Sequence, residues 1–266
     1  MQKNTIIYDA KDFNIKQTLE CGQLFRYTIK NDYAEVYSLD KKAILYQNND
    51  SIIIENEDKE YFENYFDLNC DYSKIKEELK ELPMMRNAIR YGYGIRILRQ
   101  DIVETILSFI ISANNNIPRI QGILNRIAPQ GHFPTIEELT KLTENDFKTM
   151  GCGYRASYLE KTIKTLAENK IDLSEPFNLN GFDANKYLCA NLVGVGPKVA
   201  DCILLFAYHK MDVFPVDTWV KKIYQDLFGN SASPKVIRQN LIDMYGKNAG
   251  YAQQYLFYHK RDGSKE

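Results

Sequence analysis

The chain has 266 residues, of which 44% are hydrophobic, and its formal net charge is -1 at pH 7. This length allows one large or two ordinary domains with real cores, and the near-neutral charge gives no overall reason to expect a nucleic-acid partner. No run of about 18 apolar residues occurs and the N-terminal stretch lacks a signal-peptide core, so we expect an intracellular protein with no membrane partner.

The cysteines are few and scattered, and none of them forms a C-x-x-C pair. Such a set suggests neither a disulfide framework nor a zinc site. We therefore expect reduced thiols and no bound metal. The five positions are Cys21, Cys70, Cys152, Cys189 and Cys202.

The first part of the chain has the pattern of an antiparallel sheet. Between Gln23 and Asn56, short β-branched and aromatic runs are separated by the polar turns KND, LDKK and NND. Runs of this kind with polar breaks are typical of a β-meander. The sequence therefore predicts a small β-rich domain over residues 1–85.

Helical periodicity replaces this pattern after residue 70. Residues 73–83 form an amphipathic helical pattern that ends at Pro83, and residues 100–113 are apolar enough for a central buried helix. Further helical patterns occupy residues 118–128, 135–142, 144–150, 156–169, 184–191, 198–209, 217–228, 233–246 and 249–260. The fold class is therefore α+β, with a small N-terminal antiparallel β-sheet domain followed by a larger all-helical domain over residues 86–266.

Four arginines occur without an acidic residue among them in the stretch that leads into the central helix. A cluster of this kind is either a solvated helix face and loop, which charge alone favours, or a local patch for nucleic acid. The residues are Arg86, Arg90, Arg96 and Arg99.

The segment LVGVGP, residues 192–197, joins two helical patterns and is too short for anything except a tight hairpin. Its glycines permit positive φ and leave backbone N–H groups bare, and such groups at the head of a helix bind anions. Pro197 suits the first helical turn, which puts Lys198 where the helix dipole disfavours a positive charge. Desolvation would add to this effect and favour a neutral, nucleophilic amine, but a solvated lysine beside a structural turn fits these residues equally well.

Asp217 follows the short extended run VFPV and stands at the expected N-cap of the next helix. Capping alone explains an aspartate there. A carboxylate near a nucleophilic amine can also stabilise an electron-poor sugar or help to deprotonate the amine. These are the two demands of cleaving an N-glycosidic bond through an amine.

The two segments LVGVGPKVAD and VFPVDTW together resemble the helix-hairpin-helix signature and downstream aspartate of the DNA base-excision glycosylase superfamily. Lys198 matches the lysine of the bifunctional members, which also nick the backbone, and Asp217 matches the aspartate common to the superfamily. Four more segments resemble the 8-oxoguanine DNA glycosylases of the eukaryotic type and their bacterial relatives. They are CGQLFRY (21–27), LRQDIVETILSFIISANNNIPRI (98–120), GCGYRASYL (151–159) and AGYAQQYLFYHKRD (249–262).

The resemblance implies a base-excision repair enzyme that removes 8-oxoguanine, and also formamidopyrimidine-guanine, from duplex DNA. The base is flipped out, preferably from opposite cytosine, and Lys198 forms a Schiff base that permits β-elimination and strand nicking. The family implies no cofactor and a monomer. It also implies the cytoplasm or nucleoid of a bacterium, or the nucleus of a eukaryote.

The resemblance also assigns the recognition of the damaged base. The backbone carbonyl of Gly22 would accept the N7 proton that 8-oxoguanine has and guanine lacks. Gln253 would contact the Watson–Crick edge, and Phe257 and Cys202 would sandwich the ring. Taken alone, the last two are ordinary core residues and Gly22 is an ordinary turn residue.

A second group of residues would contact the DNA around the flipped base. Three of them would hold the vacated space and read the orphaned cytosine, one would be the neighbouring wedge, and three would present backbone amides to a phosphate. In that order they are Asn114, Arg119 and Arg155; Tyr154; and Gly194, Val195 and Gly196.

Two alternatives stay open. The alkylpurine branch of the superfamily shares the aspartate but typically lacks the lysine. A non-catalytic helix-hairpin-helix module would keep the glycines and need neither Lys198 nor Asp217. The iron–sulfur branches are disfavoured, because they place four cysteines after the helical domain and here no cysteine follows Cys202.

Overall fold

The computed structural model describes residues 4–263, and its N-terminal part is a five-stranded antiparallel sheet in the order β1-β5-β4-β3-β2. The strands are β1 (Asn4–Asp9), β2 (Tyr27–Ile29), β3 (Ala34–Ser38), β4 (Lys41–Gln47) and β5 (Ser51–Asn56). The predicted meander accounts for β2 to β5. The sequence did not reveal β1, which pairs along its whole length with β5 and forms that edge of the sheet.

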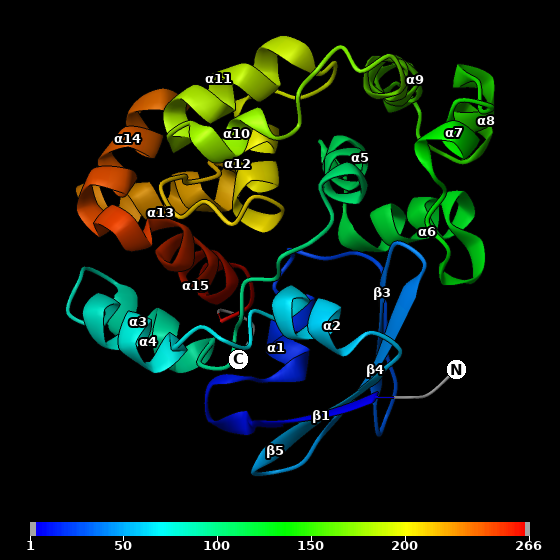
Figure 1. Ribbon diagram of the computed structural model, residues 1–266. Helices are drawn as coiled ribbons and strands as arrows, with labels where there is room; N and C mark the ends of the chain where they lie inside the picture. The colour runs from blue at the N-terminus through cyan, green and yellow to red at the C-terminus, as the bar shows by residue number, and fades with distance from the viewer. Residues whose placement is uncertain (1–3, 264–266) are drawn as a thin grey trace.

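One face of the sheet is buried because the strands alternate apolar and polar residues. Ile52 and Ile54 of β5 have no exposed surface, and Leu45 of β4 pairs with Ile54 on the same face. Helices α1 (Ile15–Glu20) and α2 (Lys59–Tyr65) cover this face and place Leu19 and Phe62 in the same small core. Figure 1 shows both helices between the sheet and the rest of the molecule.

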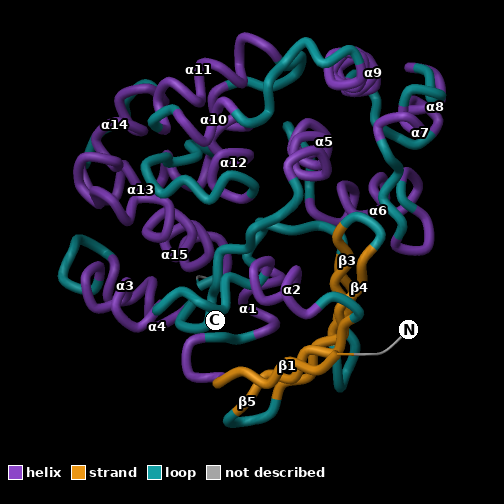
Figure 2. The backbone as a smooth tube through the Cα atoms, viewed as in Figure 1, coloured by secondary structure: helices purple, strands orange, loops and turns teal. Residues whose placement is uncertain are grey.

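The larger core is helical, which confirms the predicted α+β architecture. Its helices are α3 (Tyr72–Leu79), α4 (Met85–Tyr91), α5 (Ile102–Ser112), α6 (Ile117–Ile127), α7 (Ile136–Leu139), α8 (Glu144–Thr149), α9 (Arg155–Ala167), α10 (Glu175–Asn178), α11 (Gly181–Asn191), α12 (Pro197–Phe206), α13 (Thr218–Phe228), α14 (Pro234–Tyr245) and α15 (Ala249–Asp262). Short 3-10 turns span Ala10–Asp12, Pro129–Gly131 and Gly246–Asn248. Helix α5 is central, with α12 on one side and α6 and α9 on the other (Figure 2).

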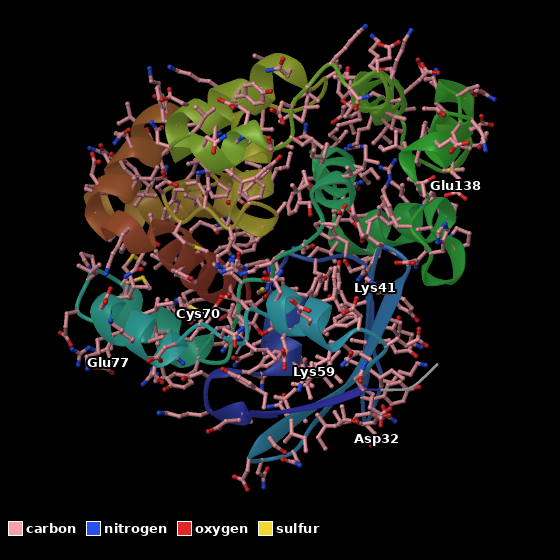
Figure 3. All side chains as sticks on the ribbon, viewed as in Figure 1. Asp32, Lys41, Lys59, Cys70, Glu77 and Glu138 are labelled. Carbon is pink, nitrogen blue, oxygen red and sulfur yellow. The ribbon has the colours of Figure 1, made fainter. Side chains whose placement is uncertain are left out.

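The helix α3 packs against the larger core although it lies within residues 1–85. Its Tyr72 and Leu79 side chains are fully buried among residues of the helical part. Charged side chains such as Glu77 and Glu138 are exposed at the edge of the molecule (Figure 3). In residues 4–263, no helix has both the length and the apolar character needed to cross a membrane.

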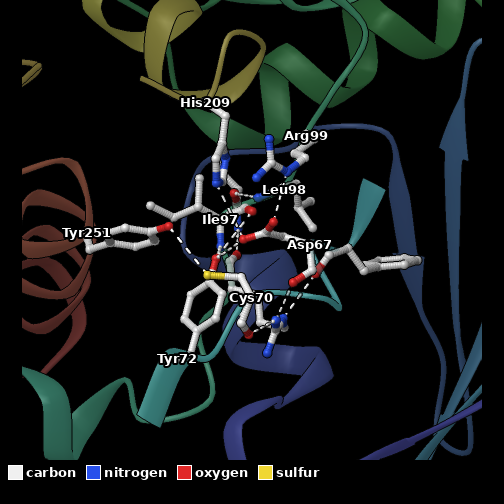
Figure 4. Close-up of polar contacts among 11 residues, drawn as sticks. Asp67, Cys70, Tyr72, Ile97, Leu98, Arg99, His209 and Tyr251 are labelled. Carbon is white, nitrogen blue, oxygen red and sulfur yellow. Dashed lines mark hydrogen bonds and ion pairs between the residues drawn. The ribbon is translucent and has the colours of Figure 1, made fainter. Parts of the chain in front are cut away.

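A buried polar cluster around Asp67 joins the two parts of the molecule (Figure 4). The Asp67 carboxylate accepts hydrogen bonds from Arg99 Nε at 2.8 Å and from the Tyr72 hydroxyl at 3.1 Å, and His209 Nε2 lies 3.4 Å away. Burial raises the pKa of the Asp67 carboxyl, but the hydrogen bonds and charges of His209 and Arg99 outweigh it and leave this pKa below its usual value. The cluster therefore depends on an ionised Asp67.

The arginine-rich stretch does not form one basic surface. Arg96 is completely buried, donates to the carbonyls of Phe66 and Cys70 at 3.0 Å each, and packs 4.1 Å from the centre of the Tyr72 ring. Arg99 is engaged by the Asp67 cluster. These two arginines hold the segment that connects α4 to α5, and at the completely buried Arg96 both the solvated and the nucleic-acid interpretations are wrong.

Candidate active site

The hairpin predicted between two helices is present between α11 and α12. Gly194 has a φ of +83°, and a Cβ at this position would lie 2.8 Å from the Tyr158 side chain. Gly196 is the N-cap of α12, has no side-chain cap, and has nothing within 4 Å of the place that a Cβ would take. The first amides of α12 are therefore open to an anion. Val195 is buried, and its amide donates to the carbonyl of Leu192 at 3.4 Å.

A buried ionic cluster fixes the hairpin on its side facing the protein interior. Asp201 accepts hydrogen bonds from Arg238 at 2.6 and 2.9 Å and from Asn185 at 2.6 Å. The Asn185 amide also donates to the carbonyl of Pro197 at 2.8 Å. Burial raises the pKa of the Asp201 carboxyl in spite of Arg238. The cluster ties α11 and α14 to the first two turns of α12, which carry Lys198.

The Lys198 amine lies near two stacked aromatic rings. Its Nζ is 5.6 Å from the centre of the Phe109 ring of α5, which stacks on Phe206. One helical turn further on is Cys202, whose thiol pKa is raised to about 11 by burial, against the opposing hydrogen bond and charge of Lys198. Within residues 4–263, no carboxylate lies within ion-pairing distance of Lys198.

Asp217 caps α13 and also lies near this group. Its Oδ1 accepts the backbone N–H groups of Trp219 and Val220 at 2.9 Å each. Its charge contributes to the raised pKa of Cys202, so Asp217 and Lys198 each lie within electrostatic reach of the Cys202 thiol. Both cap bonds use one oxygen, so the other oxygen remains for a further partner.

A second turn, residues 21–23, is held by buried hydrogen bonds and is called the recognition turn below. The Gln23 amide nitrogen donates to the carbonyls of Thr18 at 2.9 Å and Arg96 at 2.7 Å. Its amide oxygen accepts from the Leu98 backbone at 2.9 Å, and the Gln100 side chain donates to the Gln23 carbonyl at 2.7 Å. These contacts leave the turn little freedom.

Helix α15 closes over the recognition turn. The Gln254 side chain donates to the Cys21 carbonyl at 2.8 Å. Gly22 has a φ of +90°, and a Cβ at this position would lie 3.3 Å from the Phe257 ring. The sequence missed Gln23 and Gln254, because no local pattern shows that a glutamine folds back onto a backbone carbonyl.

Two buried polar atoms remain unpaired on the same face of α15. Among the described residues, Gln253 Oε1 and Arg261 Nη1 have no hydrogen-bond partner. They stand four residues before and four residues after Phe257, so all three side chains share one face of the helix. Buried polar atoms are normally satisfied, and an unpaired acceptor and donor flanking an aromatic ring therefore indicate a place for a flat polar ligand.

The predicted wedge is on the surface at the start of α9. Tyr154 is 53% exposed and packs edge-to-face on Tyr158, and the Arg155 guanidinium carbon lies 4.4 Å from the centre of the Tyr154 ring. Asn114 is exposed, with a φ of +49°, and its amide nitrogen lies 3.5 Å from the Tyr154 hydroxyl. Both are placed to meet a partner outside the molecule.

The two arginines expected at this surface have different environments. Arg119 is exposed, and its guanidinium donates a hydrogen bond to the Gly151 carbonyl at 3.2 Å. Arg155 is 3% exposed and donates to the carbonyls of Ala113 at 2.7 Å and Asn114 at 2.9 Å. Arg119 can therefore reach a ligand, whereas Arg155 holds the loop that carries Asn114.

Comparison with known proteins places the chain in a family of DNA repair proteins. Residues 5–106 match the family model of the 8-oxoguanine DNA glycosylase N-terminal domain, and residues 107–245 match that of the HhH-GPD superfamily of base excision DNA repair proteins. The chain is 33% identical over 223 residues to an N-glycosylase/DNA lyase of Arabidopsis thaliana, covering 72% of this chain and 57% of that protein. It is 31% identical over 236 residues to a probable N-glycosylase/DNA lyase of Methanothermobacter thermautotrophicus, covering 76% and 75%.

Solved structures show the same relationship over almost the whole chain. The 8-oxoguanine glycosylase/lyase of Clostridium acetobutylicum, in complex with double-stranded DNA containing cytosine opposite 8-oxoguanine, has a TM-score of 0.91 and 38% identity, with 96% of this chain and 93% of that chain covered. Its apo form gives 0.89 and 37%, with 97% of each chain covered. A 3-methyladenine DNA-glycosylase of Archaeoglobus fulgidus has a TM-score of 0.74 at 17% identity and 99% coverage of both chains, which shows a shared fold alone.

Proposed function

This chain belongs to the HhH-GPD superfamily of base excision DNA repair proteins, in the branch with an 8-oxoguanine DNA glycosylase N-terminal domain, and we propose that it excises 8-oxoguanine through Lys198. It is a bifunctional N-glycosylase and DNA lyase that acts as a monomer on duplex DNA with the damaged base opposite cytosine. Formamidopyrimidine-guanine, which shares the same hydrogen-bonding edge, is a second substrate.

One observation carries the proposal. The Lys198 amine lies beside Cys202 at the hairpin. At the recognition turn, Phe257 lies against Gly22, and the unpaired acceptor of Gln253 is one helical turn before Phe257. A purine between Cys202 and Phe257 would present N–H donors of its Watson–Crick edge to Gln253 Oε1. Its N7 edge would then face the Gly22 carbonyl.

The reaction follows from the groups at the hairpin. Neutral Lys198 Nζ attacks C1′ of the flipped nucleotide, and the bond from C1′ to N9 breaks with its electron pair passing to the departing base, which takes up a proton. Asp217 stabilises the positive charge that develops on the sugar. The sugar ring opens to a Schiff base, which loses a C2′ proton and expels the 3′ phosphate by β-elimination.

The remaining surface residues hold the duplex while the base is out. The open amides of α12 bind a backbone phosphate, and Tyr154 and Asn114 occupy the space that the base leaves. Arg119 donates to the acceptor edge of the orphaned cytosine. Arg155 contributes by holding the Asn114 loop in place.

Borohydride trapping tests the lysine assignment. Wild-type protein on a duplex with 8-oxoguanine opposite cytosine is expected to form a covalent adduct, and Lys198→Gln is expected to bind the duplex but neither trap nor cleave it. Lys186→Gln, an exposed lysine on α11, is the matched control and should behave as wild type. Trapping that persists in Lys198→Gln would refute the assignment. Excision of 3-methyladenine from a duplex, without excision of 8-oxoguanine, would favour the alkylpurine alternative.

The opposite base provides an independent test of the proposed DNA contacts. Excision of 8-oxoguanine is measured against each of the four bases for wild type and Arg119→Ala. The preference for cytosine should fall by roughly 1 to 3 kcal/mol, the value of one base contact. An equal loss of affinity for all four duplexes would show that Arg119 binds only phosphate.

A further inference from the structure

Resting on the proposed function, we propose that Arg261 is a second reader of the damaged base, donating a hydrogen bond from Nη1 to its C8 carbonyl oxygen. The recognition turn then supplies the acceptor for N7–H, and Arg261 supplies the donor for the neighbouring oxygen. Arg261 is the last residue but one of α15 and is mostly buried, with a side chain that is 14% exposed.

Hydrogen bonds from Nε and Nη2 hold the Arg261 guanidinium beside the recognition turn. Nε and Nη2 donate to the Asp262 carboxylate, and Nη2 also donates to the Glu20 carbonyl at 2.5 Å. The guanidinium carbon lies 5.2 Å from the centre of the Phe257 ring. The Asp262 charge balances that of Arg261, so a cation can remain at this partly buried place.

Of the three guanidinium nitrogens of Arg261, Nη1 is the one without a hydrogen-bond partner, and it lies at the recognition turn. It is 2.9 Å from the place that a Cβ on Gly22 would take, and it is buried without any hydrogen bond. The nearby thiol of Cys21 is a weak acceptor, and burial raises its pKa to about 11 against the charge of Arg261, which keeps it protonated. A buried unpaired donor is unfavourable, and a ligand acceptor would satisfy it.

The spacing along α15 says which edge of the base this donor meets. Gln253, Phe257 and Arg261 are four residues apart, so an acceptor, a ring and a donor follow one another along one face of the helix. If the base lies on Phe257 with its Watson–Crick edge at Gln253, its imidazole edge points toward Arg261. Gly22 adjoins Phe257 at that end.

The resulting pattern distinguishes damaged from normal guanine at two adjacent atoms. In 8-oxoguanine, N7 carries a proton and C8 carries an oxygen, so the edge reads donor then acceptor. The Gly22 carbonyl and Arg261 Nη1 are the matching acceptor and donor. In guanine, N7 is an acceptor and C8 carries a hydrogen, so both contacts are lost.

Single-turnover excision of 8-oxoguanine and β-elimination at a preformed abasic site separate this role from folding and from the Lys198 chemistry. Arg261→Met should lower excision about ten- to a hundredfold, the loss of one hydrogen bond to a charged donor. Abasic-site cleavage should stay at the wild-type level, since it requires no base. Lys260→Met, which removes the neighbouring cation paired with Asp226, is the matched control and should change neither rate.

Arg261→Lys keeps the test valid if the methionine variant fails to fold. Its single ammonium can pair with Asp262 but cannot also hold the Glu20 carbonyl and reach the base, so excision should still fall several-fold. Excision at the wild-type level in this folded variant would overturn the proposal. Equal falls in excision and abasic-site cleavage would overturn it too, because they would show a general structural role.

Isotope-edited infrared spectroscopy tests the contact itself. The C8 carbonyl of labelled 8-oxoguanine is observed in duplex complexes of Lys198→Gln with and without Arg261→Met. A hydrogen bond from a guanidinium lowers the stretching frequency, so the band should move to higher frequency in the double variant. An unmoved band would refute the contact, whereas absence of 8-oxoguanine excision by the wild-type protein would instead refute the proposed function.

Discussion

The recognition turn and the α11–α12 hairpin are both glycine-containing turns supported by buried polar contacts, yet they differ in how far they are open to a ligand. Around the recognition turn, the Gln23 side chain alone makes three buried hydrogen bonds to backbone groups, and α15 adds another from Gln254. In the hairpin, Gly196 has no neighbour within 4 Å of its Cβ position and α12 begins without a side-chain cap. The recognition turn is enclosed by the protein, whereas the hairpin, whose Gly194 packs closely against Tyr158, is open at Gly196.

Under the proposed function, the difference corresponds to what each turn would recognise. A carbonyl that distinguishes two bases by one proton must not move, because a small rotation would remove its preference. A phosphate is the same at every nucleotide, so open amides at a helix start are sufficient and any sequence can be held. Under the proposed function, the enclosed turn would therefore provide specificity, and the open end of the hairpin would provide position.

Asp217→Asn gives the largest expected effect and tests the catalytic side of the hairpin. Asparagine can still cap α13, so the free energy of unfolding should barely change. The excision rate should fall by about 10²- to 10⁴-fold, as is typical when an acid/base group is lost. Single-turnover excision and thermal unfolding measure the two quantities, and near-wild-type excision would leave Asp217 with a capping role only.

Gly22→Ala tests whether the enclosed turn carries specificity. The added methyl would meet Arg261 Nη1 at 2.9 Å and Phe257 at 3.3 Å, and alanine disfavours the φ of +90°. Excision should fall about ten- to a hundredfold because the carbonyl is displaced from N7. Affinity for an abasic-site duplex should stay nearly intact, and an equal fall in both would make Gly22 a folding residue.

Asp67→Asn tests the support behind the enclosed turn, because Asp67 holds Arg99 next to the segment that binds Gln23. Removing one partner of this buried ionic cluster should lower the free energy of unfolding at pH 7 by about 3 kcal/mol. Asp226→Asn, which breaks a more exposed ion pair with Lys260, is the control and should cost less than about 1 kcal/mol.

The pH dependence follows from the direction of the Asp67 shift. Its folded pKa is below the unfolded value, so its stabilisation is present above about pH 4 to 5 and is lost as the pH falls through the folded pKa. The difference in unfolding free energy between wild type and Asp67→Asn should therefore shrink between pH 7 and pH 3. A difference that stays constant would mean that the Asp67 charge contributes nothing.

Gly196→Ala has the smallest expected effect and sharpens the contrast between the turns. The methyl would meet no protein atom, so thermal unfolding should be unchanged within about 0.5 kcal/mol. Binding to undamaged duplex DNA should weaken several-fold, since the methyl enters the space of the phosphate. A stability loss comparable to that of Gly22→Ala would show that the open turn is as constrained as the enclosed one.

The local patterns of the chain were sufficient for most of the architecture. The β2 to β5 meander and nearly all of the long helices follow from the period of apolar residues and from capping signals. The edge strand β1 was missed because its partner β5 lies more than 40 residues away. Arg96 was misassigned because nothing in a short window shows that four backbone carbonyls surround it.

The candidate site divides in the same way. The sequence by itself determined the hairpin, Lys198 in the first turn of α12 and Asp217 at the head of α13, because each depends on a few adjacent residues. Only the tertiary structure decided that Phe257 and Arg261 lie against a turn more than 230 residues earlier in the chain. Hydrogen bonds between distant segments depend on how whole elements pack, and no local period in the sequence encodes which atoms remain unpaired.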